Sequence, residues 1–262
     1  MPLEFGLLLR RRTYSKYHSN KIATRMNSPS KIGICDVRFF PAKGSKKAIV
    51  FLPSANDKGI HPYFPRLSWH NELSQQVNVL YINDPFQHLD GYKTPMGSWY
   101  VSPIGEFVLP EVSSSIQSFL FENGIDEVIY YGSSMGGYAS LILASLHPDS
   151  HAIAECPQLF MLKHPGSRYV SENILSKDRA IDSIEPLAYL KNSNHASINI
   201  VCSLHDYHYK THVVPFADII SSLDHSIGEI DFTIYSKPSY KTGHVALNKI
   251  DAFSIIAKTM KF

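Results

Sequence analysis

Short runs of apolar, mostly β-branched residues recur along the chain, and longer segments of helical character lie between them. Runs that are apolar on both faces are typical of strands in a parallel sheet covered by helices on both sides. Their alternation with helices therefore predicts an α/β fold with a mostly parallel sheet. The expected strands are Ala48–Pro53, Val77–Asn83, Glu127–Gly132, His151–Cys156, Ile198–Leu204 and Ile230–Ser236, and the expected helices are Leu67–Gln76, Glu111–Glu122, Gly136–Leu146, Val213–Leu223 and Val245–Met260.

Three segments depart from this alternation. Cys35–Phe40 precedes the first long apolar run and is expected to pair with it as an antiparallel strand. Residues 160–194 contain no strand-like run and are rich in charge, Pro and Gly. We expect them to form a small cap or lid over the carboxyl edge of the sheet, where ligands of open α/β sheets bind. Residues 85–110 are irregular too and are expected at the same edge, so we predict a single domain over residues 32–262.

Composition adds the cellular context. A chain of 262 residues with 44% hydrophobic and 18% charged residues is that of an ordinary globular protein. No run approaches the ~20 apolar residues that span a bilayer, and the apolar stretch before the first arginines is too short for a signal-peptide core. The three cysteines are odd in number and lie in apolar surroundings. We therefore expect a cytoplasmic protein with reduced thiols and no transmembrane segment.

The charge is unevenly distributed. Residues 1–31 contain seven basic residues and one acidic residue, although the whole chain has a net charge of only +2. This predicts a basic N-terminal arm, which is either a solvated tail or a contact for a polyanion such as an acidic polysaccharide. The arm is weak evidence for nucleic-acid binding, so no nucleic-acid partner is expected.

The strongest motif is Gly132-Ser133-Ser134-Met135-Gly136, which fits G-x-S-x-G between an expected strand and an expected helix. A nucleophile elbow has this strand-turn-helix order, and its strained serine needs neighbours that are almost free of side chains. Ser134 is therefore the expected nucleophile. The amide of Met135, at the helix N-terminus, is one expected donor to an oxyanion. A phosphate-binding turn is the alternative, but the Lys–Ser/Thr pair of such loops is missing after Gly136.

The base and the acid follow from chain order, because enzymes with such an elbow place Ser first, then Asp or Glu, then His. His244 follows the last expected strand, and Gly243 before it permits a turn over the sheet edge. Asp206 lies just after the expected strand Ile198–Leu204, where an acid could hold the imidazole. Its alternative role is a helix cap, and Asp224 and Asp231 are less suitable acids because they flank or begin a strand.

A metal site is a competing interpretation of one cluster. His205, Asp206, His208 and His212 are close in sequence, but they lack the pair of histidines around a glutamate that marks helical zinc proteases. We expect no metal.

These segments together resemble the α/β-hydrolase superfamily from Ala48 to the C-terminus. A narrower resemblance is to the α/β-hydrolase-fold O-acetyltransferases of bacterial capsule polysaccharide assembly. It rests on Tyr130-Tyr131-Gly132-Ser133-Ser134 with Gly136-Gly137, on Cys156-Pro157-Gln158, on the Asp206 segment and on Gly243-His244. The resemblance implies an acetylated serine and a sugar hydroxyl as acceptor.

One feature departs from the superfamily. Its usual His-Gly after the first core strand is replaced by Pro53-Ser54-Ala55. The second oxyanion donor is still expected from this loop, at the amide of Ala55 or, failing that, of Ser54. Loop aromatics, chiefly Trp99, Tyr100 and Tyr63, are either core residues or surfaces for a carbohydrate.

The expected function is serine-dependent acyl transfer through an acyl-Ser134 intermediate. With water as acceptor the protein is an esterase or deacetylase. With a carbohydrate hydroxyl it is an O-acetyltransferase. We expect no cofactor, except that acetyl-CoA would be the acyl donor of a transferase. The alternative is a non-catalytic binding or scaffold protein that kept the fold, although such proteins typically lose a triad member.

Overall fold

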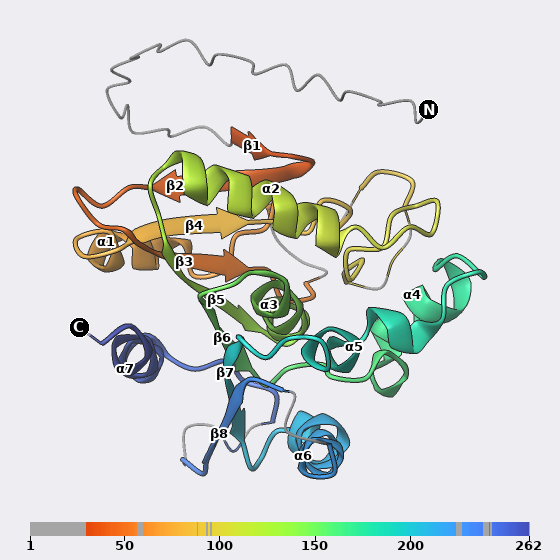
Figure 1. Cartoon of the computed structure of the whole chain (residues 1–262). Helices are drawn as coiled ribbons and strands as arrows, with labels where there is room; N and C mark the ends of the chain where they lie inside the picture. Colours follow the sequence, from red (N-terminus) through yellow and green to blue (C-terminus); the bar gives the residue numbers. More distant parts are fainter. Residues whose placement is uncertain are drawn as a thin grey trace, which may run out of the picture.

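The computed structural model describes residues 30–56, 60–87, 89–92, 94, 96–223, 227–237, 241 and 243–261 (Figure 1). Its centre is an eight-stranded sheet with the order β1-β2-β4-β3-β5-β6-β7-β8. The strands are β1 (Ser30–Ile32), β2 (Cys35–Phe40), β3 (Lys47–Leu52), β4 (Asn78–Ile82), β5 (Glu127–Ser133), β6 (Ser150–Glu155), β7 (Ser197–Ser203) and β8 (Glu229–Tyr235). All pairs from β4 to β8 are parallel, which confirms the predicted α/β class.

The helical segments lie between the strands. Those of three residues or more are η1 (Leu67–Trp69), α1 (His70–Leu73), α2 (Leu109–Glu122), α3 (Met135–Leu146), η2 (Met161–Lys163), α4 (Pro165–Asn173), η3 (Ile181–Ile184), α5 (Pro186–Leu190), η4 (Tyr209–Val213), α6 (Val214–Ser221) and α7 (Lys249–Met260). None of the described helices is both long and apolar enough to cross a membrane.

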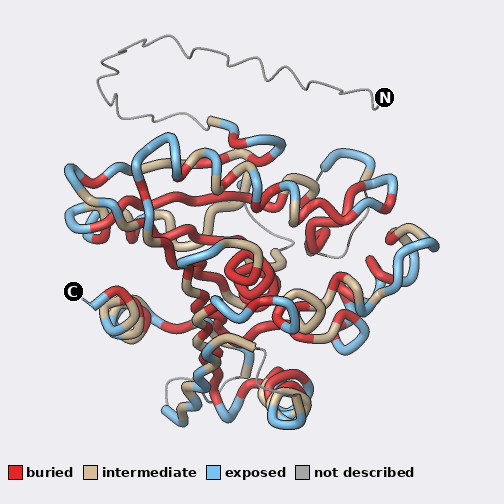
Figure 2. Tube along the Cα trace, in the orientation of Figure 1, coloured by how far each residue is buried: buried red, intermediate tan, exposed pale blue. Residues whose placement is uncertain are grey.

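Alternate residues of the central strands face two separate cores. Ile49 and Phe51 of β3 pack in a core with residues of α1 and α7. Val50 and Leu52 point to the opposite face and pack with residues of α2, α3 and α6. This alternation follows from the two-residue period of a strand. Figure 2 shows buried residues along the strands and on α3, so the sheet is covered on both faces as predicted.

The antiparallel edge differs from the prediction. β2 pairs with β4, with Val37 opposite Ile82 and Phe40 opposite Val79, and not with β3. Both edges of β3 are occupied by the parallel strands β4 and β5, so β2 pairs with the other edge of β4. β1 adds a further antiparallel strand and includes Ser30 and Lys31, which the sequence assigned to the basic arm. The rest of the arm lies outside the described residues.

Residues 160–194 form η2, α4, η3 and α5 between β6 and β7, and no strand lies in this fully described stretch. The segment is fastened to α3, since the Tyr138 hydroxyl donates to the Ile184 carbonyl at 2.7 Å. Figure 1 shows α4 and α5 on the α3 side of the sheet. Their position agrees with an insertion into the α/β alternation, and its action as a cap or lid stays a prediction.

The last helix begins later than predicted. The apolar residues Val245 and Leu247 suggested a start at residue 245, but α7 begins at Lys249. Asn248 is its N-cap, with a side chain that accepts a hydrogen bond from the Asp251 amide. Residues 243–248 are consequently a loop, and His244 lies in it.

Candidate active site

Ser134 lies between the end of β5 and the start of α3, with φ 57° and ψ −113°. This is a strained conformation for a residue with a side chain. The turn is tight: a Cβ on Gly132 would lie 2.2 Å from the backbone of Gly136, and a Cβ on Gly136 would lie 2.8 Å from the Leu52 carbonyl oxygen. Only glycine fits at both positions, which is the arrangement that an elbow requires.

Backbone hydrogen bonds hold the strained residue from three directions. The Ser134 amide donates to the Glu155 carbonyl at 2.9 Å, and the Ser134 carbonyl accepts from the amides of Tyr138 (3.0 Å) and Gln158 (3.3 Å). The elbow is therefore tied to the end of β6 and to the loop that follows it. Ser134 itself is buried, with 6% of its surface exposed.

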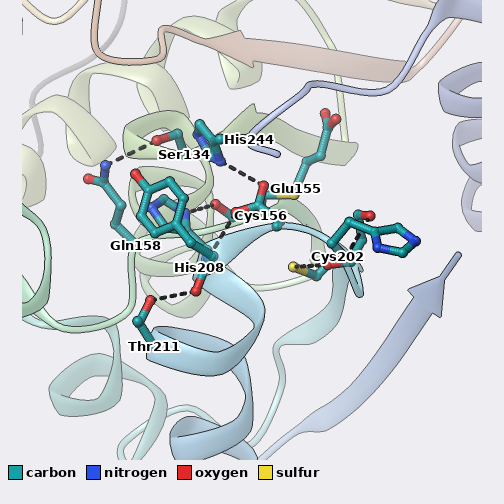
Figure 3. A network of polar contacts seen from close by, with 12 residues as sticks. Ser134, Glu155, Cys156, Gln158, Cys202, His208, Thr211 and His244 are labelled. Carbon is teal, nitrogen blue, oxygen red and sulfur yellow. Dashed lines mark hydrogen bonds and ion pairs between the residues drawn. The ribbon is translucent and has the colours of Figure 1, made fainter. Parts of the chain in front are cut away.

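Asp206 and His244 come together at the same edge. Asp206 lies after β7 and is 2% exposed, and its Oδ2 lies 2.7 Å from His244 Nδ1. Its Oδ1 accepts from the His208 amide at 2.8 Å. With Nδ1 of His244 directed at a carboxylate, Nε2 is the ring nitrogen left to act as a base. In Figure 3 the Ser134 hydroxyl is directed toward Gln158, and the His244 ring is bonded on its Nδ1 side to the Asp206 carboxylate.

The electrostatics keep Asp206 ionised. Burial alone would raise the pKa of its carboxyl, but the hydrogen bond from His244 and the charge on that ring outweigh it, helped by the His208 amide and the Cys156 thiol. The net effect lowers the pKa of Asp206, so it is a carboxylate at neutral pH. The competing acids are placed differently: Asp231 is exposed on β8, and Asp224 lies outside the described residues.

The two expected oxyanion donors follow neighbouring parallel strands of the sheet, Ala55 after β3 and Met135 after β5. Met135 is the first residue of α3, and Ala55 follows β3 in the neighbouring loop. A Cβ on Gly97 would lie 2.6 Å from Met135 Sδ and 3.6 Å from Ala55 Cβ, so both side chains lie beside Gly97. The reserve donor, Ser54, has a carbonyl that accepts from Gln87 Nε2 at 3.1 Å. The role of either amide as an oxyanion donor stays a prediction.

Two of the three expected aromatic residues are not placed as surfaces for a substrate. Trp99 and Tyr100 are both 0% exposed, so neither ring offers a face to a ligand, whereas Tyr63 is partly exposed. The Trp99 indole instead donates to Gln158 Oε1. An exposed ring that the sequence did not single out lies at the site: Tyr207 is 47% exposed, with its ring centroid 5.4 Å from that of His244.

Glu155 is a second residue that sequence reasoning missed. Its side chain is fully buried and forms an ion pair with Arg66 at 2.6 Å, while the Tyr131 hydroxyl donates to the same carboxylate at 3.0 Å. The other oxygen accepts from the Leu247 amide, three residues beyond His244. Glu155 thus holds the nucleophile elbow through its backbone and the loop of His244 through its side chain.

The candidate metal ligands that are close in sequence, His205, Asp206, His208 and His212, do not gather as one group among the described residues. Among the described residues, the ligand atoms that gather within 4.8 Å are those of Cys156, Asp206 and His244, of which the last two already bond to each other. His208 donates from Nδ1 to the Cys156 carbonyl at 2.7 Å, and burial followed by the charge of His244 lowers its pKa to about 4. Burial and the neighbouring His208 lower the pKa of His212 to about 3, so both rings are neutral.

Solved structures share this architecture at low sequence identity. The capsule O-acetyltransferase of Neisseria meningitidis serogroup A is 18% identical with a TM-score of 0.65, over 88% of this chain and 92% of that one. A variant of this enzyme in complex with CoA is 17% identical with a TM-score of 0.64, over 88% of this chain and 93% of that one. The acylaminoacyl peptidase of Pyrococcus horikoshii is 16% identical with a TM-score of 0.61. The match covers 87% of this chain but only 39% of the peptidase. No protein-family model and no curated protein sequence matches the chain. These likenesses show that the chain has the α/β-hydrolase fold.

Proposed function

We propose that this protein is a serine-dependent acyl-transfer enzyme with Ser134 as nucleophile, His244 as base and Asp206 as the acid that orients it. The observation that carries the proposal is the 2.7 Å contact between His244 Nδ1 and Asp206 Oδ2, at the sheet edge where Ser134 occupies its strained turn. A binding or scaffold protein of the same fold would need neither the paired carboxylate and imidazole nor a strained serine beside them.

The first half-reaction acylates the serine. The Ser134 hydroxyl proton passes to His244 Nε2 while Oγ forms a bond to the carbonyl carbon of the donor, whose π electrons move onto the carbonyl oxygen. The amides of Met135 and Ala55 stabilise that oxyanion. When the oxyanion collapses, the leaving group departs with its electron pair and takes the proton from His244. Asp206 stabilises the imidazolium between the two proton transfers.

The second half-reaction decides between hydrolysis and transfer. An acceptor O–H gives its proton to His244 and attacks the acyl carbon, and Ser134 Oγ leaves and recovers a proton from the imidazolium. Water as acceptor makes the protein an esterase or deacetylase, and a sugar hydroxyl makes it an O-acyltransferase. The same serine chemistry serves both outcomes.

For the acceptor we favour a carbohydrate and for the acyl group acetyl, with acetyl-CoA as a donor. The support is the likeness to a capsule O-acetyltransferase, a variant of which is described in complex with CoA. A further support is the exposed ring of Tyr207 beside His244, because sugar faces stack on aromatic rings. On this proposal a polysaccharide lies across the sheet edge and the basic N-terminal segment attracts its negative charge.

Acyl partitioning tests the acceptor. The purified protein is given a small activated acetyl ester or acetyl-CoA, with and without added oligosaccharide, and acetate and acetylated sugar are both quantified. We expect acetylated sugar to form at the expense of acetate, and Tyr207→Ala to reduce the sugar product more than hydrolysis of the small ester. Release of acetate alone with every oligosaccharide tried would make the protein a hydrolase.

Removing residues 1–29, which leaves strand β1 in place, tests the partner. We expect turnover of the small ester to persist, because the triad residues lie elsewhere in the chain. Action on a polyanionic polysaccharide should weaken, most visibly at low ionic strength where charge attraction is least screened. Equal action of the full and shortened chains on a polyanion at low salt would show that this segment takes no part in binding.

A further inference from the structure

Gln158 contacts the proposed nucleophile directly. Its Nε2 donates to Ser134 Oγ at 3.0 Å, and its backbone amide donates to the Ser134 carbonyl at 3.3 Å (Figure 3). Gln158 is 1% exposed, so water does not compete for these bonds. A buried amide beside a reacting oxygen can either donate to it or accept from it, and the two orientations have opposite consequences for the serine proton.

Trp99 decides the orientation of that amide. An indole nitrogen can only donate a hydrogen bond, and the Trp99 indole donates to Gln158 Oε1. The oxygen end of the amide must therefore face Trp99 and the NH₂ end must face Ser134. Without the indole donor, the two ends could exchange places by a rotation about the terminal torsion.

Trp99 is itself held in place by an unusual turn. Trp99 and Tyr100 have φ values of 49° and 58°, which bulky residues rarely adopt. The carboxylate of Asp84, which is 0% exposed, accepts hydrogen bonds from the Ser98 amide and hydroxyl and from the Tyr100 amide. These bonds stabilise the turn, and backbone strain of this kind gathers at functional sites.

The consequence concerns the hydroxyl proton of Ser134. Because Oγ already accepts a hydrogen bond from Gln158, its own O–H is free to be donated elsewhere, toward His244. We propose, on the basis of the acyl-transfer function above, that Gln158 is a further catalytic residue whose amide donates to the nucleophilic oxygen, and that Trp99 is the positioning residue that keeps it donating.

The donor acts in both half-reactions. When Ser134 loses its proton to His244, negative charge grows on Oγ until the bond to the acyl carbon forms. When the acyl group is passed on, Oγ departs with the bonding electron pair before it recovers a proton. A hydrogen bond that strengthens as charge develops lowers both barriers. Since the donor contacts the oxygen of Ser134 and not the acceptor, it should leave the partition between water and sugar unchanged.

The experiment measures release of 4-nitrophenol from 4-nitrophenyl acetate, together with thermal unfolding, in four variants and in Ser134→Ala. Gln158→Met keeps the length of the side chain but removes the donor, and we expect kcat/KM to fall by about 10²-fold. Trp99→Phe removes the indole donor together with part of the buried ring, and should lower kcat/KM by about tenfold. The partition between acetate and acetylated sugar should be unchanged in both variants. Tyr100→Phe is the matched control from the same turn: its hydroxyl is buried without a hydrogen-bond partner among the described residues, so its loss should leave kcat/KM as it was.

The fourth variant supplies a readout that a structural role would not move. In Gln158→Glu the introduced carboxyl still accepts a hydrogen bond from Trp99. Once it is ionised, however, it also accepts a hydrogen bond from the Ser134 hydroxyl, which turns that O–H away from His244. When protonated it can donate to Oγ again, so the ratio of variant to parent activity should rise as the pH is lowered. Parent-like kcat/KM in Gln158→Met, equal effects of Trp99→Phe and Tyr100→Phe, or a pH-independent ratio for Gln158→Glu would overturn the proposal. Ester cleavage that survives in Ser134→Ala would instead refute the acyl-transfer function itself.

Discussion

Replacing Glu155 by Gln tests whether one buried carboxylate supports both the fold and the site. The site presents donors on two sides of the side chain: Arg66 and the Tyr131 hydroxyl on one oxygen, and the Leu247 amide on the other. A carboxylate accepts from both sides, whereas an amide has one acceptor and one donor end. In either orientation the NH₂ group of the glutamine faces another donor, either the Leu247 amide or the Arg66 guanidinium. The guanidinium also loses its counter-charge.

The magnitude follows from burial. The side chains of Arg66 and Glu155 are 12% and 0% exposed, and breaking such a buried pair from one side costs about 3–5 kcal/mol. At about 2–4 °C per kcal/mol for a chain of this size, the melting temperature should fall by roughly 10 °C. The loop of His244 also loses an anchor at Leu247, so kcat should decrease even at temperatures where the variant is folded.

The assay is urea unfolding followed by tryptophan fluorescence, with kcat for a small ester measured in parallel. Glu127→Gln is the matched control, because the Lys47–Glu127 pair is 35% and 34% exposed and should contribute at most about 1 kcal/mol. Adding Arg66→Met to Glu155→Gln removes the uncompensated cation and should recover part of the lost stability. A Glu155→Gln protein as stable as Glu127→Gln, with normal kcat, would refute the reasoning.

Two further predictions concern single residues near the site. Asp206→Asn should lower kcat for a small ester by about 10³–10⁴-fold, because the imidazole loses its orienting carboxylate. The unfolding free energy should change little. Full activity in this variant would show that Asp206 only caps a helix. His212 titrates near pH 6.5 when unfolded and only at about 3 when folded, so the unfolded state binds more protons between these values. His212 should therefore make the protein less stable as the pH drops below about 6.5, contributing up to about 1.4 kcal/mol per pH unit to a slope that His164 and His208 share. His212→Asn keeps an acceptor for the Leu159 and Phe160 amides and should flatten this dependence in urea unfolding, whereas an unchanged slope would contradict it.

The main strands and the serine turn were predictable because their signals are local. Each expected strand is an apolar run, and the elbow needs glycine at Gly132 and Gly136, which the sequence shows directly. The pairing of β2 was not predictable from adjacency, because its partner is set by which sheet edge is free. The start of α7 depends on a capping residue and on a bond from Leu247 to a distant carboxylate, and an apolar pattern carries neither.

The supporting residues of the site were not predictable for a similar reason. Gln158 bonds to Ser134 across 24 positions and to Trp99 across 59, and Glu155 bonds to Leu247 across 92. No local pattern marks such pairs. An aromatic residue in a loop signals neither burial nor exposure. The sequence therefore left both alternatives open for Trp99 and Tyr100, which are buried, and did not single out Tyr207, which is exposed.

The central claim is that His244 activates Ser134, and the rate of labelling by a fluorophosphonate at neutral pH tests it most directly. The probe should attach to Ser134, as located by peptide mass spectrometry, and Ser134→Ala should take up none. Ser133→Ala is the neighbouring control and should be labelled like the parent, while His244→Ala should be labelled orders of magnitude more slowly. Attachment to Ser133, or an undiminished rate in His244→Ala, would contradict the account.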